Sequence, residues 1–184
     1  MTTLAADAWP PAPIRTDRLV LRASEARDRA AFVELFASPE VGTYIGGAQP
    51  REEVERAMPE VPGQRPGLFV VERAGAMIGV VTTLDRPDPG QPEAELGYLF
   101  LPEAWGHGYA AEACAAALDW LAASLPGTSA LLRTRSANEP SMRLAARLGF
   151  TEVKRYEEYG AEQWLGVREG RTGAGGVQGV AFGT

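Results

Sequence analysis

The sequence predicts a mixed α/β fold in one domain, and three observations support this. Runs with strand-like alternation and runs with helical spacing of apolar residues follow one another along the chain. A glycine-containing turn at residues 73–76 joins two β-rich runs, as in a hairpin. Another β-rich run, at residues 94–101, leads through a glycine loop into an alanine-rich helical stretch at 109–123. The chain has 184 residues, 45% of them hydrophobic, which is enough for one well-filled core.

The first half of the chain is expected to form a strand, two helices and the hairpin. Residues 18–22 (RLVLR) alternate between apolar and charged side chains, which predicts a strand. Apolar residues recur at helical spacing over 26–36 and more loosely over 51–58, so each stretch predicts a helix. The runs at 68–72 and 77–84 are then the two arms of the hairpin.

The middle of the chain contains a loop and the strand–loop–helix unit. Residues 85–92 hold three prolines and one glycine, which predicts a loop. The strand at 94–101 ends before a proline, and the helix over 109–123 is expected to stop near Pro126-Gly127.

A further strand and a short capped helix follow. Residues 130–134 (ALLRT) predict a strand. Asn138 is a good N-cap for a helix that runs to Leu148. Gly149 is well placed to end this helix in the left-handed conformation.

Closing strands at 151–156 and 162–167 complete a domain that we place at residues 13–169. Residues 1–12 are rich in alanine and proline, and residues 170–184 are rich in glycine without a periodic pattern. We therefore expect both ends to be flexible tails.

The net charge of the chain indicates which classes of binding partner are expected. The chain has 18 Lys plus Arg against 24 Asp plus Glu, a net charge of −6. This argues against nucleic acid or an anionic membrane as a partner and mildly favours a cationic acceptor. An anionic ligand would have to be bound by local groups.

Cysteine and histidine usage points to a cytoplasmic protein without a metal. Cys114 is the only cysteine, so no intramolecular disulfide can form. His107 is the only histidine, and neither residue has a carboxylate cluster at ligand spacing around it. Residues 1–13 lack the features of a signal peptide, and no apolar run approaches the roughly 18 residues of a membrane helix.

The glycine loop at residues 105–110 is the first feature of the sequence that indicates a binding site. A strand that delivers the chain through Gly106 and Gly108 directly into a helix leaves several main-chain N–H groups aimed at one spot, where anions bind. Gly106 is expected to have a positive φ, and Gly108 would let the backbone approach phosphate oxygens. Ala111 occupies the third glycine position of a dinucleotide fingerprint, which disfavours that class. Two glycines of this spacing also occur in ordinary loops.

Four ordered segments give the loop a more specific meaning. The loop reads Trp105-x-x-Gly108-x-Ala110 and resembles motif A of the GNAT N-acetyltransferases, Gln/Arg-x-x-Gly-x-Gly/Ala. The other matching segments are PIRTDRLVLRA (13–23), LFVVERAGAMIGVVTTL (68–84) and NEPSMRLAARLGF (138–150). Together they resemble the RimJ/RimL-like subgroup of ribosomal-protein N-terminal acetyltransferases and its small-molecule relatives, in which an aromatic residue is frequent at the position of Trp105.

The resemblance implies a fold and a binding site for acetyl-CoA. The fold would be a mixed, mostly antiparallel sheet, split near Leu101 where the cofactor enters, with helices on both faces. The main chain of Phe100 and Leu101 would bind the pantetheine arm, and Asn138 and Ser141 would face the pantetheine and the thioester. The full set of cofactor-binding residues implied is Phe100, Leu101, Gly106, His107, Gly108, Tyr109, Ala110, Ala111, Asn138 and Ser141.

Two residues are candidates for catalysis. Glu95 lies on the central strand and would accept the proton of the attacking ammonium, because only a neutral amine is nucleophilic. Ser141 would donate a hydrogen bond to the leaving sulfur. Each has a structural alternative: Glu95 as a salt-bridged strand residue, and Ser141 as a first-turn serine. Asn138 likewise has its role as a helix cap.

Other candidates are given structural roles or none. Many members of the family use a tyrosine on the last helix as the acid for the departing thiolate, but Ala145 occupies that position here. Glu112, in the first turn of the loop helix, is expected to stabilise the helix. Cys114 is expected to be a buried small residue, and His107 is not expected to be a base.

The function predicted is transfer of an acetyl group from acetyl-CoA to a primary amine by direct attack in a ternary complex. The acceptor suggested by the subgroup is a protein N-terminal α-amine, and a small-molecule amine such as an antibiotic or a polyamine is the alternative. A non-catalytic acyl-CoA-binding domain is a further alternative, which the absence of a tyrosine at Ala145 supports. A homodimer is the assembly we carry forward, because dimers are the commonest.

Overall fold

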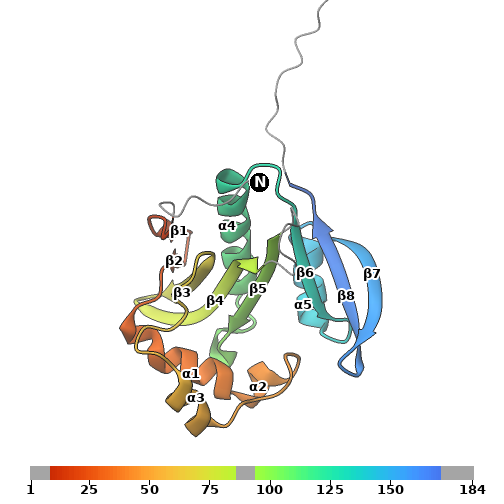
Figure 1. Ribbon diagram of the computed structural model, residues 1–184. Helices are drawn as coiled ribbons and strands as arrows, with labels where there is room; N and C mark the ends of the chain where they lie inside the picture. The colour runs from red at the N-terminus through yellow and green to blue at the C-terminus, as the bar shows by residue number, and fades with distance from the viewer. Residues whose placement is uncertain (1–8, 86–93, 171–184) are drawn as a thin grey trace, which may run out of the picture.

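A computed structural model describes residues 9–85 and 94–170, which form an eight-stranded sheet with helices on both faces (Figure 1). The strands are β1 (Ile14–Arg15), β2 (Val20–Arg22), β3 (Leu68–Arg73), β4 (Ala76–Asp85), β5 (Ala94–Phe100), β6 (Ala130–Arg135), β7 (Thr151–Glu158) and β8 (Ala161–Arg168). The helices are α1 (Arg29–Ala37), α2 (Pro39–Gly42), α3 (Arg51–Ala57), α4 (Tyr109–Ser124) and α5 (Glu139–Arg147), with 3₁₀ turns at Ala26–Asp28 and Pro102–Ala104. The mixed α/β prediction is confirmed.

The sheet has the order β1-β2-β3-β4-β5-β6-β8-β7 and is antiparallel except between β5 and β6. These two strands share only the pairs Ala94↔Ala130 and Glu95↔Leu131 and then diverge, as Figure 1 shows. The split was expected near Leu101, but it begins directly after Glu95 and opens toward Leu101. Beyond this point each strand is paired only along its outer edge, β5 with β4 and β6 with β8.

Local signals explain most element boundaries. Ala74 and Gly75 both have positive φ, 50° and 83°, which matches the hairpin turn between β3 and β4. The side chain of Asn138 accepts a hydrogen bond from the Ser141 amide at 3.2 Å and so caps α5. Gly149 has a φ of 83° just after α5, so its predicted helix-ending role is confirmed.

Two short elements were not predicted. Strand β1 has only two residues, and helix α2 only four. Ser38 caps α2 by accepting a hydrogen bond from the Val41 amide at 3.3 Å, and Pro39 occupies its first position. The expected loop at 85–92 lies outside the described residues except for Asp85, which ends β4.

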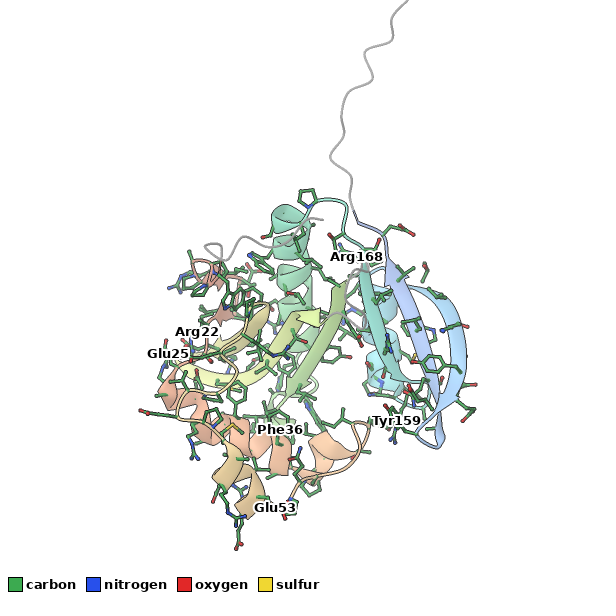
Figure 2. All side chains as sticks on the ribbon, viewed as in Figure 1. Arg22, Glu25, Phe36, Glu53, Tyr159 and Arg168 are labelled. Carbon is green, nitrogen blue, oxygen red and sulfur yellow. The ribbon has the colours of Figure 1, made fainter. Side chains whose placement is uncertain are left out.

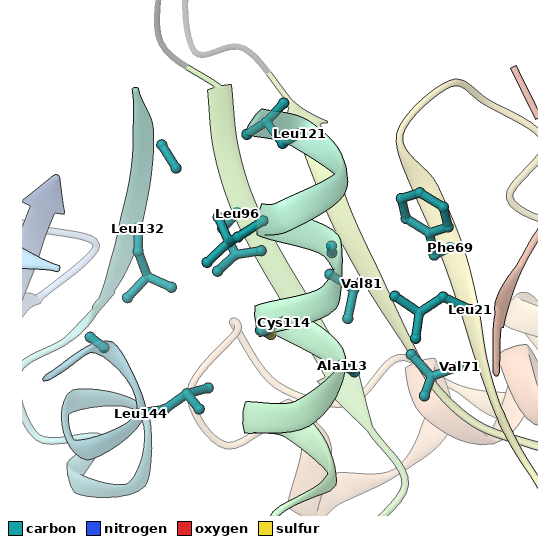
Figure 3. Close-up of a cluster of buried hydrophobic side chains, with 14 of the residues drawn as sticks. Leu21, Phe69, Val71, Val81, Leu96, Ala113, Cys114, Leu121, Leu132 and Leu144 are labelled. Carbon is teal, nitrogen blue, oxygen red and sulfur yellow. The ribbon is translucent and has the colours of Figure 1, made fainter. Parts of the chain in front are cut away.

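The hydrophobic side chains form two cores, one on each face of the sheet. The first core lies between the sheet and α4 and α5, and it includes Leu21, Phe69, Val81, Leu96, Cys114, Leu132 and Leu144 (Figure 3). The second core lies between the sheet and α1, and it includes Phe32, Leu35, Leu68, Val70, Val80 and Leu101. Neighbouring strand residues alternate between the two cores, as the pleat of a sheet requires.

The N-terminal boundary of the packed domain lies earlier than expected. Trp9, in the segment 1–12 that was expected to be a tail, contacts the rings of Phe69 and Trp120 at centroid distances of 4.9 and 5.7 Å. It packs against the first core. The rest of both expected tails falls largely on residues 1–8 and 171–184, outside the described ranges. Within the described ranges, no helix is long and apolar enough to cross a bilayer.

A buried ion-pair network ties the start of the domain to the sheet. Arg22, on β2, binds both carboxylate oxygens of Asp28 at 2.8 and 2.9 Å, and its Nε lies 2.6 Å from Glu72 of β3. Glu25 lies at the edge of this network, close to Arg22 (Figure 2). Burial of Asp28 opposes its ionisation, but the hydrogen bonds from Arg22 and from the Glu25 main chain, together with the charges of Arg22 and Arg27, outweigh burial and hold the pKa of the carboxyl below its usual value.

Replacing Arg22 by alanine should cost about 3–5 kcal/mol of unfolding free energy, because it leaves the Asp28 carboxylate buried without its partner. Arg51→Ala is the matched control, since Arg51 and its partner Glu34 are about half exposed, and it should change stability by less than about 1 kcal/mol. Urea unfolding at pH 7 measures both.

The stabilising effect of this network should disappear in acid. The lowered pKa of Asp28 means that its contribution is complete above the unfolded value of about 4 and is lost as the pH falls through the folded value. The difference between wild type and Arg22→Ala should therefore shrink below about pH 4. Equal differences at pH 7 and in acid would contradict the assignment.

Candidate functional site

A cleft of about 1160 Å³ occupies the split between β5 and β6. Its walls come from both faces of the sheet: the glycine loop and the starts of α4 and α5 at one end, and α1, α2 and the segment after α2 at the other. The split is thus a passage through the sheet, because the residues that line it come from elements on both faces.

The free edge of β5 faces this passage. Leu101 donates its main-chain N–H to the Ile78 carbonyl at 2.9 Å, on the β4 side. Because successive residues of a strand direct their main-chain groups to opposite edges, those of Tyr98 and Phe100 point into the cleft. The Phe100 carbonyl accepts a hydrogen bond from the Trp105 indole N–H at 2.9 Å. Leu101 itself lies in the second core and does not line the cleft.

The glycine loop presents main-chain donors at the start of α4. Gly106 and Gly108 have φ values of 78° and 79°, so the predicted positive φ of Gly106 is confirmed and Gly108 shares it. No side chain caps α4. The amides of Tyr109, Ala110 and Ala111 have no hydrogen-bond acceptor among the described residues. These donors and the positive end of the helix dipole suit an anion.

Two arginines flank the same helix start, beside a second cavity of about 460 Å³ that His107 also lines. Arg18 binds the Glu112 carboxylate at 2.6 Å and donates to the His107 carbonyl at 2.9 Å. Arg147, on α5, makes no ion pair within the parts of the chain that the structure describes. Arg147 is therefore an uncompensated cation at this end.

Glu112 has the structural role expected of it. Thr16 donates to its carboxylate at 2.6 Å, and Arg18 donates through its main-chain N–H and its side chain at 3.0 and 2.7 Å. Partial burial of Glu112 opposes ionisation, but these hydrogen bonds outweigh it and lower the pKa of the carboxyl. Glu112 thereby fixes the β1–β2 turn against α4.

Two hydroxyls meet in the middle of the cleft. The Ser141 Oγ lies 2.5 Å from the Tyr98 phenol oxygen, and Ser141 is positioned by the Asn138 cap. Burial raises the pKa of Tyr98 to about 12, against a smaller opposing effect of the Ser141 hydrogen bond. The phenol therefore keeps its proton throughout the neutral range.

Glu95 stands at the other end of the cleft, on the opposite face of the sheet. Leu96 lies in the first core and Leu99 packs against the second, so alternation along β5 places Glu95 on the second-core face. Its carboxylate lies 3.7 Å from Arg133 Nε of β6, across the point where the strands part. The prediction that Glu95 reaches the cleft is confirmed, and so is a salt-bridged environment for it.

Most of the predicted site residues come together in one cleft. Glu95, Phe100, Gly106, Gly108, Tyr109, Ala110, Ala111, Asn138 and Ser141 all line it. His107 lines the second cavity instead, and Leu101 is in the core. Sequence reasoning missed Tyr98, Arg18 and Arg147. Period-two alternation from Leu96 could have singled out Tyr98, whereas the contacts of Arg18 join residues 94 positions apart.

Cys114 is fully buried in the first core, and this burial raises the pKa of its thiol. Its predicted role as a small packing residue is confirmed. No group of three or more His, Cys, Asp or Glu side chains placed to hold a metal ion occurs in residues 9–85 and 94–170.

Comparison with known proteins identifies the arrangement. Residues 18–151 match the family model described as the acetyltransferase (GNAT) domain. The Bacillus subtilis protein YkkB is 33% identical over 141 residues, which cover 73% of this chain and 82% of YkkB. Mycobacterium smegmatis RimJ, solved in complex with CoA-disulfide, is 21% identical, with a TM-score of 0.68 and 88% of each chain covered. A Salmonella typhimurium acetyl transferase that modifies the N-terminal serine of ribosomal protein L7/L12 is 19% identical, with a TM-score of 0.66 and 84% and 96% covered.

Cys114 should resist alkylation in the folded protein, because its thiol is buried and held in the unreactive protonated form. Intact mass spectrometry after iodoacetamide treatment at pH 8 should show no adduct without denaturant and one adduct in 8 M urea, since the chain has one cysteine. Rapid alkylation without denaturant would mean that the thiol is accessible from the cleft. Cys114 would then be a candidate nucleophile for covalent catalysis.

Proposed function

Because this chain belongs to the GNAT family of acyl-CoA-dependent N-acyltransferases, we propose that it transfers an acetyl group from acetyl-CoA to a primary amine by direct attack in a ternary complex. One observation carries the proposal: a single passage joins the uncapped start of α4 on one face of the sheet to Glu95 on the other. A donor and an acceptor can enter such a passage from opposite sides and meet within the split.

The donor end fits coenzyme A in shape and charge. The unpaired amides of Tyr109, Ala110 and Ala111 would bind the pyrophosphate, with Arg147 nearby as a free cation. The cleft-facing main chain of Tyr98 and Phe100 would bind the pantetheine amides as a neighbouring strand would. Asn138 and Ser141 would lie beside the thioester, and Leu101 is not needed for this mode of binding.

Glu95 would act as the base. Direct attack requires a neutral amine, and a carboxylate at the acceptor face can accept the ammonium proton directly or through a water molecule. Arg133 holds this carboxylate where the strands part. The salt bridge and a role as base are compatible, because Arg133 contacts the carboxylate without blocking its access to the cleft.

Ser141 and Tyr98 would stabilise the departing thiolate. In this arrangement the Tyr98 phenol would donate a hydrogen bond to Ser141 Oγ, and the Ser141 hydroxyl would donate one to the sulfur. The high pKa of the phenol keeps that proton available. Many members of the family have a tyrosine on the last helix, at the position that Ala145 occupies here. Tyr98, which reaches the cleft from β5, would supply a phenol in place of that tyrosine. The absence of a tyrosine there is therefore not a reason to assign a non-catalytic acyl-CoA-binding role.

For the acceptor we propose a protein N-terminal α-amine, with a small-molecule amine as the alternative. The first choice rests on the RimJ/RimL-like sequence segments and on the fold shared with the Salmonella enzyme that modifies an N-terminal serine. A panel of N-terminal peptides and small amines, analysed by mass spectrometry after incubation with acetyl-CoA, would separate the two.

Gly108→Val should abolish acetyl-CoA binding, because a β-branched side chain would hold the loop backbone away from the phosphates. Gly108 has positive φ, so the substitution should also cost about 1–2 kcal/mol in backbone strain. Gly160→Val is the matched control: Gly160 has a φ of 72°, lies in the β7–β8 turn and carries the same strain away from the cleft. Titration calorimetry should show binding lost in the first variant and kept in the second.

Glu95→Gln should lower kcat/KM about 10²- to 10⁴-fold near neutral pH, with a smaller effect at high pH where the amine is already neutral. Ser141→Ala should have a smaller effect, since one hydrogen bond to the thiolate is worth on the order of 1–3 kcal/mol. Neither should change acetyl-CoA affinity, because both act in the transition state. Glu162→Gln, at an exposed position of β8, is the control. Wild-type rates in Glu95→Gln at every pH would remove Glu95 from the mechanism.

A further inference from the structure

The second-core face of the cleft holds an arginine that the proposed reaction does not use. Leu132 lies in the first core, so alternation along β6 places Arg133 and Arg135 on the opposite face, together with Glu95. Both arginines line the cleft. The acceptor end of the passage is therefore flanked on its β6 side by two guanidinium groups.

The two arginines differ in their partners. Arg133 is paired with Glu95 at 3.7 Å. Arg135 is half-buried, and its side chain makes no hydrogen bond or ion pair with any residue in the described ranges. Gln163, its partner across the β6–β8 ladder, donates its side-chain N–H groups to the carbonyls of Glu158 and Ala161. Gln163 brings no charge that would neutralise Arg135.

A half-buried guanidinium without a counter-ion favours an anionic ligand. Its partial burial removes some hydration, and its planar fork of N–H donors matches a carboxylate with two parallel hydrogen bonds. The phosphates of the donor are not this ligand, because the start of α4 and Arg147 lie at the first-core end of the passage. The anion must therefore enter with the acceptor.

Resting on the proposed function, we infer that the acceptor is a primary amine with a carboxylate a few bonds from the nitrogen, and that Arg135 binds this carboxylate while Glu95 faces the amine. Same-face residues of a strand are about 7 Å apart, so Arg135 lies one such step beyond the Glu95–Arg133 pair. A free amino acid and a peptide with an acidic residue near its N-terminus share this chemistry.

The opposite wall suits the apolar part of such an acceptor. Tyr44 and Ile45, in the segment after α2, line the cleft and are 40% and 52% exposed, and Phe36 of α1 lies beside them in the lining. The net charge of −6 suggested a cationic acceptor, but it is an average over the whole chain. Arg135 adds an unpaired positive charge to this end of the cleft, and local charge decides recognition.

Binding of reaction products tests the inference without requiring turnover. The full chain, with and without CoA, is titrated by NMR with N-acetylleucine and its carboxamide, and with N-acetyl-Ser-Asp-amide and N-acetyl-Ser-Asn-amide. The carboxylate member of at least one pair should bind about 10- to 100-fold more tightly than its neutral counterpart, as a charge-assisted pair predicts. The first pair reports on free amino acids and the second on peptides.

Arg135→Gln should abolish this preference and leave the affinity for the neutral ligands within about twofold. Arg168→Gln is the matched control: Arg168 is half-buried, has no ion pair in the described ranges and lies at the other end of β8 (Figure 2). Arg135→Lys keeps the charge without the fork, and should retain part of the preference even if Arg135→Gln folds poorly.

The outcomes separate the two proposals. No carboxylate preference in the wild type, or a preference that survives in Arg135→Gln, overturns the role of Arg135. A preference that depends on Arg135 in a protein that transfers no acetyl group to any amine in the panel confirms the anion site and overturns the proposed function.

Discussion

The short pairing between β5 and β6 is the constraint on which the site depends. Two residue pairs hold the strands together, and beyond Glu95 each strand has a partner only on its outer side. The unpaired edge of β5 would favour a further strand, because main-chain donors and acceptors need partners. On the first-core face, Leu96, Leu132 and Leu144 pack in the space between the diverging strands and α4 and α5 (Figure 3). The split is therefore a packed feature of the fold.

Local signals made much of the fold predictable from the sequence. The hairpin requires positive φ at its turn, the loop before α4 needs its glycines, and α5 needs Asn138 to start and Gly149 to end. Each of these requirements is met within a few residues. Strand β1 and helix α2 were missed because two and four residues are too short to show a period. Trp9 was assigned to a tail because its partners, Phe69 and Trp120, are distant in sequence.

The parts of the site that depend on the sheet register could not be predicted in this way. The main chain of Leu101 was expected to bind the pantetheine arm, but the pairing with β4 uses its N–H and turns Tyr98 and Phe100 to the free edge. The split itself begins after Glu95 and opens toward Leu101. Ser141 was identified from its motif, but its partner Tyr98 comes from a strand 43 positions earlier. A sequence motif identifies site residues within one segment of the chain. Which residues of another segment contact them depends on the register of strand pairing.

The distribution of charge along the passage gives each end its own chemistry. At the start of α4, main-chain donors and Arg147 favour an anion, while Glu112 neutralises Arg18 and fixes the loop. At the far end Arg133 compensates Glu95, which leaves Arg135 as the cation without a partner in the described ranges. Between them lies the neutral pair of Tyr98 and Ser141. In the proposed reaction, two anionic groups of different reactants would be bound at opposite faces of the sheet, and their reactive groups would meet near the hydroxyls of Tyr98 and Ser141. This separation supports the proposed direct transfer, because neither reactant would have to leave before the other enters.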